Sequence, residues 1–281
     1  MYKISKEFRD IHGSVCISGS KSESNRLLLL RAYTSFFKIF NLSDSDDTQL
    51  MISAIESDKE EINIGHAGTA MRFLTSYFSS ISEKSKVLTG SERMRQRPIS
   101  ILIDALRDLG CDIEYIEKKG FPPLKIIGKN ILSNSVTLPA NVSSQYVSSL
   151  MMLGVSLKNG LKIILSSNIT SLPYLLMTKK IIERIGGIVK IQDREIFIEP
   201  FKEKVISEQF VESDWSSASY FFSLAALSSS VNLTLSKFFN DSLQGDSKLV
   251  DIYKMFGIET IFEDDQIILK KNKISLPKNI Y

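Results

Sequence analysis

The chain has 281 residues, of which 43% are hydrophobic and 24% charged, a composition typical of folded proteins and not of disordered ones. It contains 35 Lys and Arg residues and 32 Asp and Glu residues, and the resulting net charge of +3 is too small for a dedicated nucleic-acid-binding protein. Two cysteines and two histidines at scattered positions give neither a disulfide framework nor a zinc-binding spacing. The length allows two domains.

Residues 1–10 lack the unbroken apolar stretch of a signal peptide, and no segment reaches the ~18 consecutive apolar residues of a membrane span. The most apolar run, residues 27–30, lies between Arg26 and Arg31 and amounts to one turn of a buried helix. We therefore expect a cytoplasmic protein that does not associate with a membrane.

The segment SGSKSESNR at residues 18–26 lies between a strand-like run at 14–18 and a leucine-rich helix. Small residues let the backbone approach a ligand, a helix N-terminus favours negative charge, and Lys21 and Arg26 add positive charges. The pattern predicts a site for phosphate or carboxylate, although a serine-capped helix with exposed charges would use the same residues. The G-x-x-x-x-G-K-[ST] spacing of a P-loop does not occur, which disfavours nucleotide hydrolysis.

A second glycine-rich helix start follows at GHAGTAMR, residues 65–72, and RMRQRP at 93–98 brings three arginines within five residues. A guanidinium binds a carboxylate or phosphate through two parallel hydrogen bonds. An arginine just before Pro98, which favours a helix start, is therefore suited to holding an anion. A solvated turn is the alternative interpretation of the arginine cluster.

One pattern recurs three times: an amphipathic helix ends at a glycine, and two short β-rich runs follow. The helices end at Gly110, Gly187 and Gly257, each of which would supply the left-handed backbone conformation that turns the chain back into a strand. We interpret the recurrence as a repeated unit of strand, helix, strand, helix and hairpin in an α/β fold.

Small polar residues mark further helix starts at VSSQY (142–146), SLPY (171–174) and DWSSASY (214–220). Hydroxyl and amide groups at helix starts can bind a small polyol phosphate through neutral donors, but the same residues cap helices in many proteins. Trp215 is interpreted as a packing residue, and Asp214 as a helix cap. Either His12 or His66 could act as a base, and no G-x-S-x-G motif supports serine hydrolysis.

Taken together, these segments resemble the 5-enolpyruvylshikimate-3-phosphate (EPSP) synthases, or 3-phosphoshikimate 1-carboxyvinyltransferases. The matching motifs occur in the family's order between residues 18 and 246: SGSKSESNR, SDDT, GHAGTAMR, LTGSERMRQRP, SSQY, SLPY, DWSSASY and LQGD. The resemblance implies inverse βαβαββ repeats, with residues 20–211 as a complete three-repeat domain and residues 1–19 and 212–281 as part of another.

The activity that the resemblance implies is transfer of the enolpyruvyl group of phosphoenolpyruvate to the 5-hydroxyl of shikimate 3-phosphate. Phosphate is released, no metal or organic cofactor is needed, and the product leads to chorismate and the aromatic amino acids. The family's inhibitor glyphosate would bind in the place of phosphoenolpyruvate.

Carried over to this sequence, the family's residues imply two overlapping sites. Shikimate 3-phosphate would be bound by Lys21, Ser22, Arg26, Ser143, Ser144, Gln145, Ser171 and Tyr174. Phosphoenolpyruvate would be bound by Lys21, Gly68, Arg97 and Gln145. Two polyanions need converging cations and helix N-termini, which these residues supply. The family usually has Asn where this chain has His66.

The family's C-terminal part supplies an Asp and a Glu for proton transfer, and those positions lie beyond residue 281, so no catalytic residue is assigned in this sequence. The resemblance thus implies a shortened synthase. We expect the chain by itself to bind shikimate 3-phosphate weakly and to turn over poorly or not at all.

Two alternatives stay open. The enolpyruvyl transferases that act on UDP-N-acetylglucosamine share the repeats but rely on a loop cysteine, whereas Cys16 and Cys111 fall in strand-like runs. The other alternative is a non-catalytic domain derived from the synthase, or a relative of the RNA-terminal-phosphate cyclases. No aromatic residue is interleaved with the arginine cluster, which argues against RNA.

Overall fold

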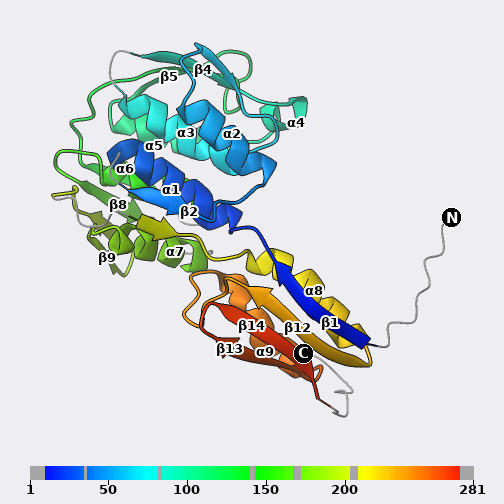
Figure 1. Cartoon of the computed structure of the whole chain (residues 1–281). Helices are drawn as coiled ribbons and strands as arrows, with labels where there is room; N and C mark the ends of the chain where they lie inside the picture. Colours follow the sequence, from blue (N-terminus) through cyan, green and yellow to red (C-terminus); the bar gives the residue numbers. More distant parts are fainter. Residues whose placement is uncertain are drawn as a thin grey trace. The chain divides into compact units, whose positions relative to one another are not determined.

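The structure is a computed structural model that describes residues 10–34, 37–81, 84–139, 143–166, 172–202 and 208–272 (Figure 1). The chain divides into two units: unit 1 comprises the part up to Ser20 and the part from Val211, and unit 2 runs from Lys21 to Phe210. The domain boundaries expected from the sequence, 19/20 and 211/212, stay a prediction.

In the described residues of unit 2, two four-stranded sheets share one strand order, β3-β4-β6-β5 and β7-β8-β10-β9. In each sheet the first two strands are parallel and the last two form an antiparallel hairpin. A further parallel pair joins β2 (Lys38–Phe40) to β11 (Glu208–Phe210). The other strands are β3 Glu61–Asn63, β4 Ser85–Thr89, β5 Asp112–Tyr115, β6 Leu124–Ile127, β7 Ser135–Leu138, β8 Leu161–Leu165, β9 Val189–Gln192 and β10 Glu195–Ile198.

The helices of unit 2 are α1 Lys21–Thr34, α2 Asp46–Ile55, α3 Gly68–Ser80, α4 Glu92–Arg95, α5 Ser100–Asp108, α6 Ser144–Gly154 and α7 Leu172–Arg184. Helices α1, α2, α3, α5 and α6 lie between the sheet of β4 and β5 and the sheet of β8 and β9 (Figure 1). Residues 23–30 of α1 and 146–154 of α6 are all buried, because both helices pack on other helices and not only on a sheet. This position explains the apolar run at residues 27–30.

Within residues 10–20 and 211–272, unit 1 forms a sheet of order β1-β12-β14-β13, again with a parallel first pair and an antiparallel hairpin. Its strands are β1 Asp10–Cys16, β12 Ser230–Ser236, β13 Ile258–Glu263 and β14 Gln266–Lys271. Helices α8 (Trp215–Leu227) and α9 (Leu249–Lys254) pack on this sheet, and a 3-10 turn, η1 (Gly245–Lys248), precedes α9. The strand expected at 14–18 is β1, which begins earlier and ends at Cys16.

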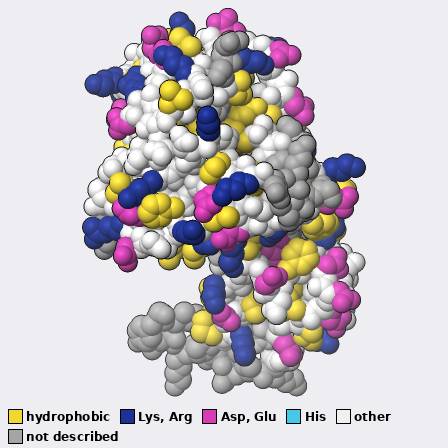
Figure 2. Space-filling model, turned by 90° about the vertical axis from the view of Figure 1, so that its left-hand side faces the viewer, with side chains coloured by type: hydrophobic (Ala, Val, Ile, Leu, Met, Phe, Trp, Pro, Cys, Tyr) yellow, Lys and Arg dark blue, Asp and Glu magenta, His cyan; other side chains and the backbone are white. Residues whose placement is uncertain are grey.

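Trp215 lies in the core of unit 1, fully buried, with its ring centroid 4.8 Å from that of Phe238 and 6.2 Å from that of Phe222. The packing role predicted for this residue is confirmed. On the face drawn in Figure 2, Lys and Arg side chains are interspersed with Asp and Glu.

The pattern of helix, glycine and hairpin is present at α5-β5-β6, α7-β9-β10 and α9-β13-β14. Gly110 and Gly257 have φ values of +97° and +79°, as predicted. In the second copy the prediction of Gly187 is wrong, because α7 ends at Arg184 and the left-handed residue is Gly186, with φ +91°. The three sheets share a strand order, and the repetition of complete βαβαββ units stays a prediction.

The Glu212 carboxylate is buried close to the start of α8. One oxygen accepts hydrogen bonds from Trp215 Nε1 at 2.7 Å and Phe239 N at 2.9 Å. The other accepts from Ser242 Oγ at 2.5 Å and Gln244 Nε2 at 3.2 Å. Burial raises the pKa of Glu212 above its ordinary value, and the hydrogen bonds oppose that rise. The motifs DWSSASY and LQGD therefore meet around one carboxylate.

We expect Glu212→Gln to lower the free energy of unfolding at pH 7 by about 1–2 kcal/mol, because the new amide group turns a donor toward the amide donor of Gln244. In the wild type, the raised folded-state pKa means that the carboxyl group contributes less stability as pH rises from about 4.5 through that pKa. The variant should lack this decline. Denaturant unfolding followed by fluorescence of Trp215 across this pH range tests both points, and parallel pH profiles would contradict the assignment.

Candidate anion-binding site

The guanidinium of Arg26 marks the place where α1, α3, α6 and α7 meet in unit 2. Arg26 is 2% exposed, and its Nε donates to Thr178 Oγ1 of α7 at 2.7 Å. Its Nη2 donates to Ser148 Oγ of α6 at 3.3 Å, and its Cζ lies 5.6 Å from the ring centroid of Phe73 in α3. All of these residues belong to the first two turns of their helices. The helices therefore begin close to one another, on one side of unit 2.

Converging helix starts make this region electropositive. Each N-terminus presents backbone N–H groups without intrahelical acceptors and about half a positive charge from the helix dipole. Lys21, at the first position of α1, adds a partly exposed ammonium group that lies 3.8 Å from a carboxylate oxygen of Asp47 in α2. Such an arrangement favours an anionic ligand.

The structure brings together most of the residues predicted to bind shikimate 3-phosphate. Those at or next to the helix starts are Lys21, Ser22, Ser143, Ser144, Gln145 and Tyr174. Ser143 caps α6, since its Oγ accepts from the backbone N–H of Gln145 at 3.3 Å. The half-exposed Tyr174 ring has its centroid 5.9 Å from Arg26 Cζ. Ser171 lies outside the described residues.

Arg26 differs from these residues because it lies beneath the surface. Its donors bond to protein acceptors, including the Ser22 carbonyl oxygen at 2.8 Å. Burial lowers the pKa of Arg26 to about 10, so the side chain stays charged at neutral pH. The buried charge adds to the positive potential above it, and direct contact with a ligand stays a prediction.

Arg97 and Gly68 form a second cluster at the start of α3. A Cβ atom at Gly68 would lie 2.1 Å from Arg97 Nη1, so the guanidinium rests directly on the glycine. Among the described residues, the Arg97 guanidinium has no hydrogen bond or ion pair, and it lines a groove of about 630 Å³ with His66, Arg93 and Met94. We refer to this as the Arg97 groove.

Arg72, which the sequence reasoning did not single out, supports the Arg97 groove from below. It is buried, and its guanidinium donates to the carbonyl oxygens of Gly68 at 3.1 Å and Pro98 at 3.0 Å. Burial, together with the charge of Arg97, lowers the pKa of Arg72. An arginine four residues after Gly68 in an otherwise apolar helix turn was the signal that could have revealed it.

Gln145 connects the two clusters. Its Nε2 donates to Thr69 Oγ1 at 3.1 Å and so ties the start of α6 to the start of α3. Tyr146, the next residue, donates its hydroxyl to the Pro98 carbonyl oxygen at 2.7 Å, beside the Arg97 groove. The helix starts around Arg26 and the Arg97 groove are therefore adjacent, as two ligands that react with each other would require.

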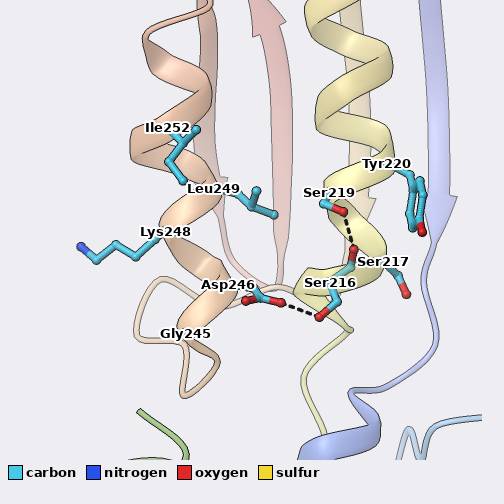
Figure 3. Close-up of a pocket in the computed structure, with 9 residues that line it drawn as sticks. All are labelled: Ser216, Ser217, Ser219, Tyr220, Gly245, Asp246, Lys248, Leu249 and Ile252. Carbon is cyan, nitrogen blue, oxygen red and sulfur yellow. Dashed lines mark hydrogen bonds between the residues drawn. The ribbon is translucent and has the colours of Figure 1, made fainter. Parts of the chain in front are cut away.

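A separate cavity of about 730 Å³ lies in unit 1 between α8 and the segment of η1 and α9 (Figure 3). The Ser216 hydroxyl donates to the Asp246 carboxylate there, and Asp214 caps α8 by accepting from Ser217 N at 2.9 Å, as predicted. Lys248, the cation on its wall, pairs with Asp251 at 3.1 Å. This cavity therefore lacks the free positive charge of the Arg97 groove.

Among the described residues, no group of three or more His, Cys, Asp or Glu side chains is placed to hold a metal ion. In the same part of the chain, no helix combines the length and apolarity needed to span a bilayer.

Unit 2 is thus an α/β unit whose converging helix starts suit a polyanionic small molecule. Residues 52–280 match the family model described as EPSP synthase (3-phosphoshikimate 1-carboxyvinyltransferase). The chain belongs to the EPSP synthase family.

Similar proteins agree with this assignment. A 3-phosphoshikimate 1-carboxyvinyltransferase of Bacteroides fragilis strain YCH46 is 44% identical over 264 residues, which cover 93% of this chain and 64% of the relative. One from Colwellia psychrerythraea is 34% identical over 286 residues, covering 92% of this chain and 67% of the relative. The solved EPSP synthase of Acinetobacter baumannii shares the fold, with a TM-score of 0.72 at 19% identity, over 97% of this chain and 68% of that one. The chain thus spans about two thirds of the length of these relatives.

Proposed function

We propose that this chain acts in enolpyruvyl transfer from phosphoenolpyruvate to the 5-hydroxyl of shikimate 3-phosphate, with release of phosphate, in the cytoplasmic synthesis of chorismate and aromatic amino acids. The observation that carries the proposal is the adjacency of the helix starts around Arg26 and the Arg97 groove, which offers two anion sites in contact. Family membership supports the same assignment.

Shikimate 3-phosphate would bind where α1, α6 and α7 begin, with its phosphate near Lys21, Ser143 and Ser144. Phosphoenolpyruvate would bind in the Arg97 groove against Gly68, and glyphosate would compete for that place. Gln145, hydrogen-bonded at the junction, would orient both ligands. The 5-hydroxyl oxygen would bond to the enol carbon that bears the phosphate, while the hydroxyl proton is lost and a proton is added to the methylene carbon, which gives a tetrahedral intermediate. Loss of phosphate and of one proton from the new methyl group then restores the double bond, and the cations stabilise the leaving phosphate.

Binding of shikimate 3-phosphate, measured by calorimetric titration, tests the proposal. We expect saturable binding that Lys21→Met weakens about 10-fold, since the variant loses one charge contact. The matched control is Lys125→Met, at an exposed position of β6, which should bind like the wild type. Failure of the wild type to bind, or equal behaviour of the two variants, would reject the proposed site.

Turnover by this chain is a separate question, because the chain spans 64% of its Bacteroides relative. We expect little or no phosphate release from shikimate 3-phosphate and phosphoenolpyruvate at ordinary enzyme concentrations. Ready turnover would contradict that expectation and leave the binding proposal intact, whereas binding of shikimate 3-phosphate without turnover also fits a non-catalytic member of the family.

The alternative of a UDP-N-acetylglucosamine enzyme gains no support from the cysteines. Cys16 is exposed at the end of β1, and Cys111 is buried directly before β5, outside the Arg97 groove. Burial raises the pKa of Cys111 to about 12, which leaves it as an unreactive thiol.

We therefore expect iodoacetamide at pH 8 to modify one thiol per native chain and both after unfolding. Mass spectrometry of the native protein should find the label on Cys16, and Cys16→Ser should abolish native labelling. Modification of native Cys111 at a comparable rate would contradict its burial.

A further inference from the structure

His66 lies at the rim of the Arg97 groove, in the turn between β3 and α3. Its Nδ1 is 2.8 Å from Ser91 Oγ, and that hydroxyl also caps α4 by accepting from Met94 N at 3.3 Å. The backbone N–H of Ser91 donates to the Gly65 carbonyl oxygen at 2.9 Å. The imidazole is thus oriented by Ser91, which the backbone of Gly65 and the start of α4 hold in place.

The hydrogen bonds determine what the imidazole presents to a ligand. Ser91 Oγ accepts from Met94, so in the neutral state its single hydrogen is free to go to Nδ1 of His66, which places the imidazole hydrogen on Nε2. In the charged state Nδ1–H donates to Ser91 Oγ instead. Among the described residues Nε2 has no partner, and it carries a hydrogen in both states. Protonation therefore changes the charge of His66 without moving the ring.

The surroundings of His66 are cationic. Arg93 and Arg97 line the same groove, and Arg72 lies beneath it. On α4, Glu92 and Arg95 are the other charged residues, and Arg95 is neutralised by Glu117 at 2.9 Å. Within the described part of the chain, no carboxylate is ion-paired to His66, Arg93 or Arg97. An anion bound among these cations favours a proton on His66.

We propose that His66 is a pH-dependent third cation of the Arg97 groove, which takes up a proton when a ligand bearing phosphoryl or carboxylate groups binds beside Arg97. The inference rests on the proposed function of the groove. By linkage, the anion raises the pKa of His66, and protonation of His66 tightens anion binding by the same factor. An unperturbed imidazole titrates near pH 6.5 and a phosphate monoester near pH 6, so both groups change charge over the same range.

The two histidines of the chain allow a direct test, because His12 lies exposed on β1 in unit 1 and serves as an internal reference. Imidazole NMR signals of the full chain are followed from pH 5 to 9 with and without saturating phosphoenolpyruvate, at constant ionic strength. The His66→Asn variant assigns the signals. We expect the pKa of His66 to rise by about 0.5–1, equivalent to roughly 3- to 10-fold tighter binding to the protonated form, while His12 does not respond.

Binding isotherms distinguish the effect of the His66 charge from a structural effect of replacing the side chain. His66→Asn retains an amide that can bond to Ser91, so it should bind phosphoenolpyruvate like the neutral wild type at pH 8 and lack the gain at pH 6. Binding that depends on Arg97, shown by its loss in Arg97→Met, with an unmoved His66 pKa would overturn this inference alone. Absence of phosphoenolpyruvate binding at every pH would overturn both the inference and the proposed function. If His66→Asn does not fold, His12→Asn at the exposed position on β1 assigns the signals instead, so the NMR titration still decides the point.

Discussion

Gly68→Ala is expected to weaken phosphoenolpyruvate binding roughly 10- to 100-fold while leaving the fold intact. The added Cβ would lie 2.1 Å from Arg97 Nη1 and 2.7 Å from Cζ, so the guanidinium must leave its place on α3. A charge-assisted hydrogen bond contributes about 1.5–3 kcal/mol, which is the affinity lost if Arg97 can no longer meet the anion. Alanine suits the first turn of a helix, so stability should change by less than about 1 kcal/mol.

A double-mutant cycle checks that the effect of Gly68→Ala passes through Arg97. In an Arg97→Ala background the side chain with which the new methyl group collides is absent, so Gly68→Ala should cost little further affinity. Calorimetry measures binding, and thermal unfolding of the same samples excludes a loss of structure. Full additivity of the two substitutions would show that alanine blocks the ligand itself and not the guanidinium.

The sequence predicted which helix starts form the candidate site, but it did not predict which of the site's side chains are buried. Helix starts at Gly68 and Ser144 follow from local signals, small polar residues before an apolar run, which act within a few residues of the chain. Burial of Arg26 depends on Ser148 and Thr178, which lie 122 and 152 positions away. No local pattern could reveal that these hydroxyls form the acceptor set for a buried guanidinium.

The fold shows the same division between local and distant causes. The helix that ends near Gly110 and the hairpin after it were predictable, because a left-handed glycine and two short β-rich runs lie side by side in the sequence. The parallel pair β2–β11 was not, since Lys38–Phe40 and Glu208–Phe210 are brought together by everything between them. The misplaced Gly187 shows a third limit, because helix ends are uncertain by one or two residues even where the helix is clear.

Arg26→Ala is expected to lower the free energy of unfolding by about 3–5 kcal/mol and to abolish measurable binding of shikimate 3-phosphate. The substitution removes a long, buried side chain and opens a cavity among α1, α3, α6 and α7. It also leaves the Ser22 carbonyl oxygen without its side-chain donor. Ser148 and Thr178 stay bonded to each other at 2.9 Å, which limits the cost in unsatisfied hydroxyls.

Arg26→Met separates the loss of stability from the loss of shikimate 3-phosphate binding. Methionine fills much of the same volume without a charge, and replacing a buried charge by an apolar side chain of similar size is often close to neutral. Glu23 then loses the favourable charge of Arg26 and keeps that of Arg184, whose Nη1 is 3.9 Å away, so we expect a loss of about 1–2 kcal/mol and a folded chain. Binding should still fall at least 10-fold, because the positive charge beneath the helix starts is gone. If Arg26→Met binds shikimate 3-phosphate as the wild type does, the helix N-termini and Lys21 suffice for the anion, and Arg26 serves the packing of unit 2 alone.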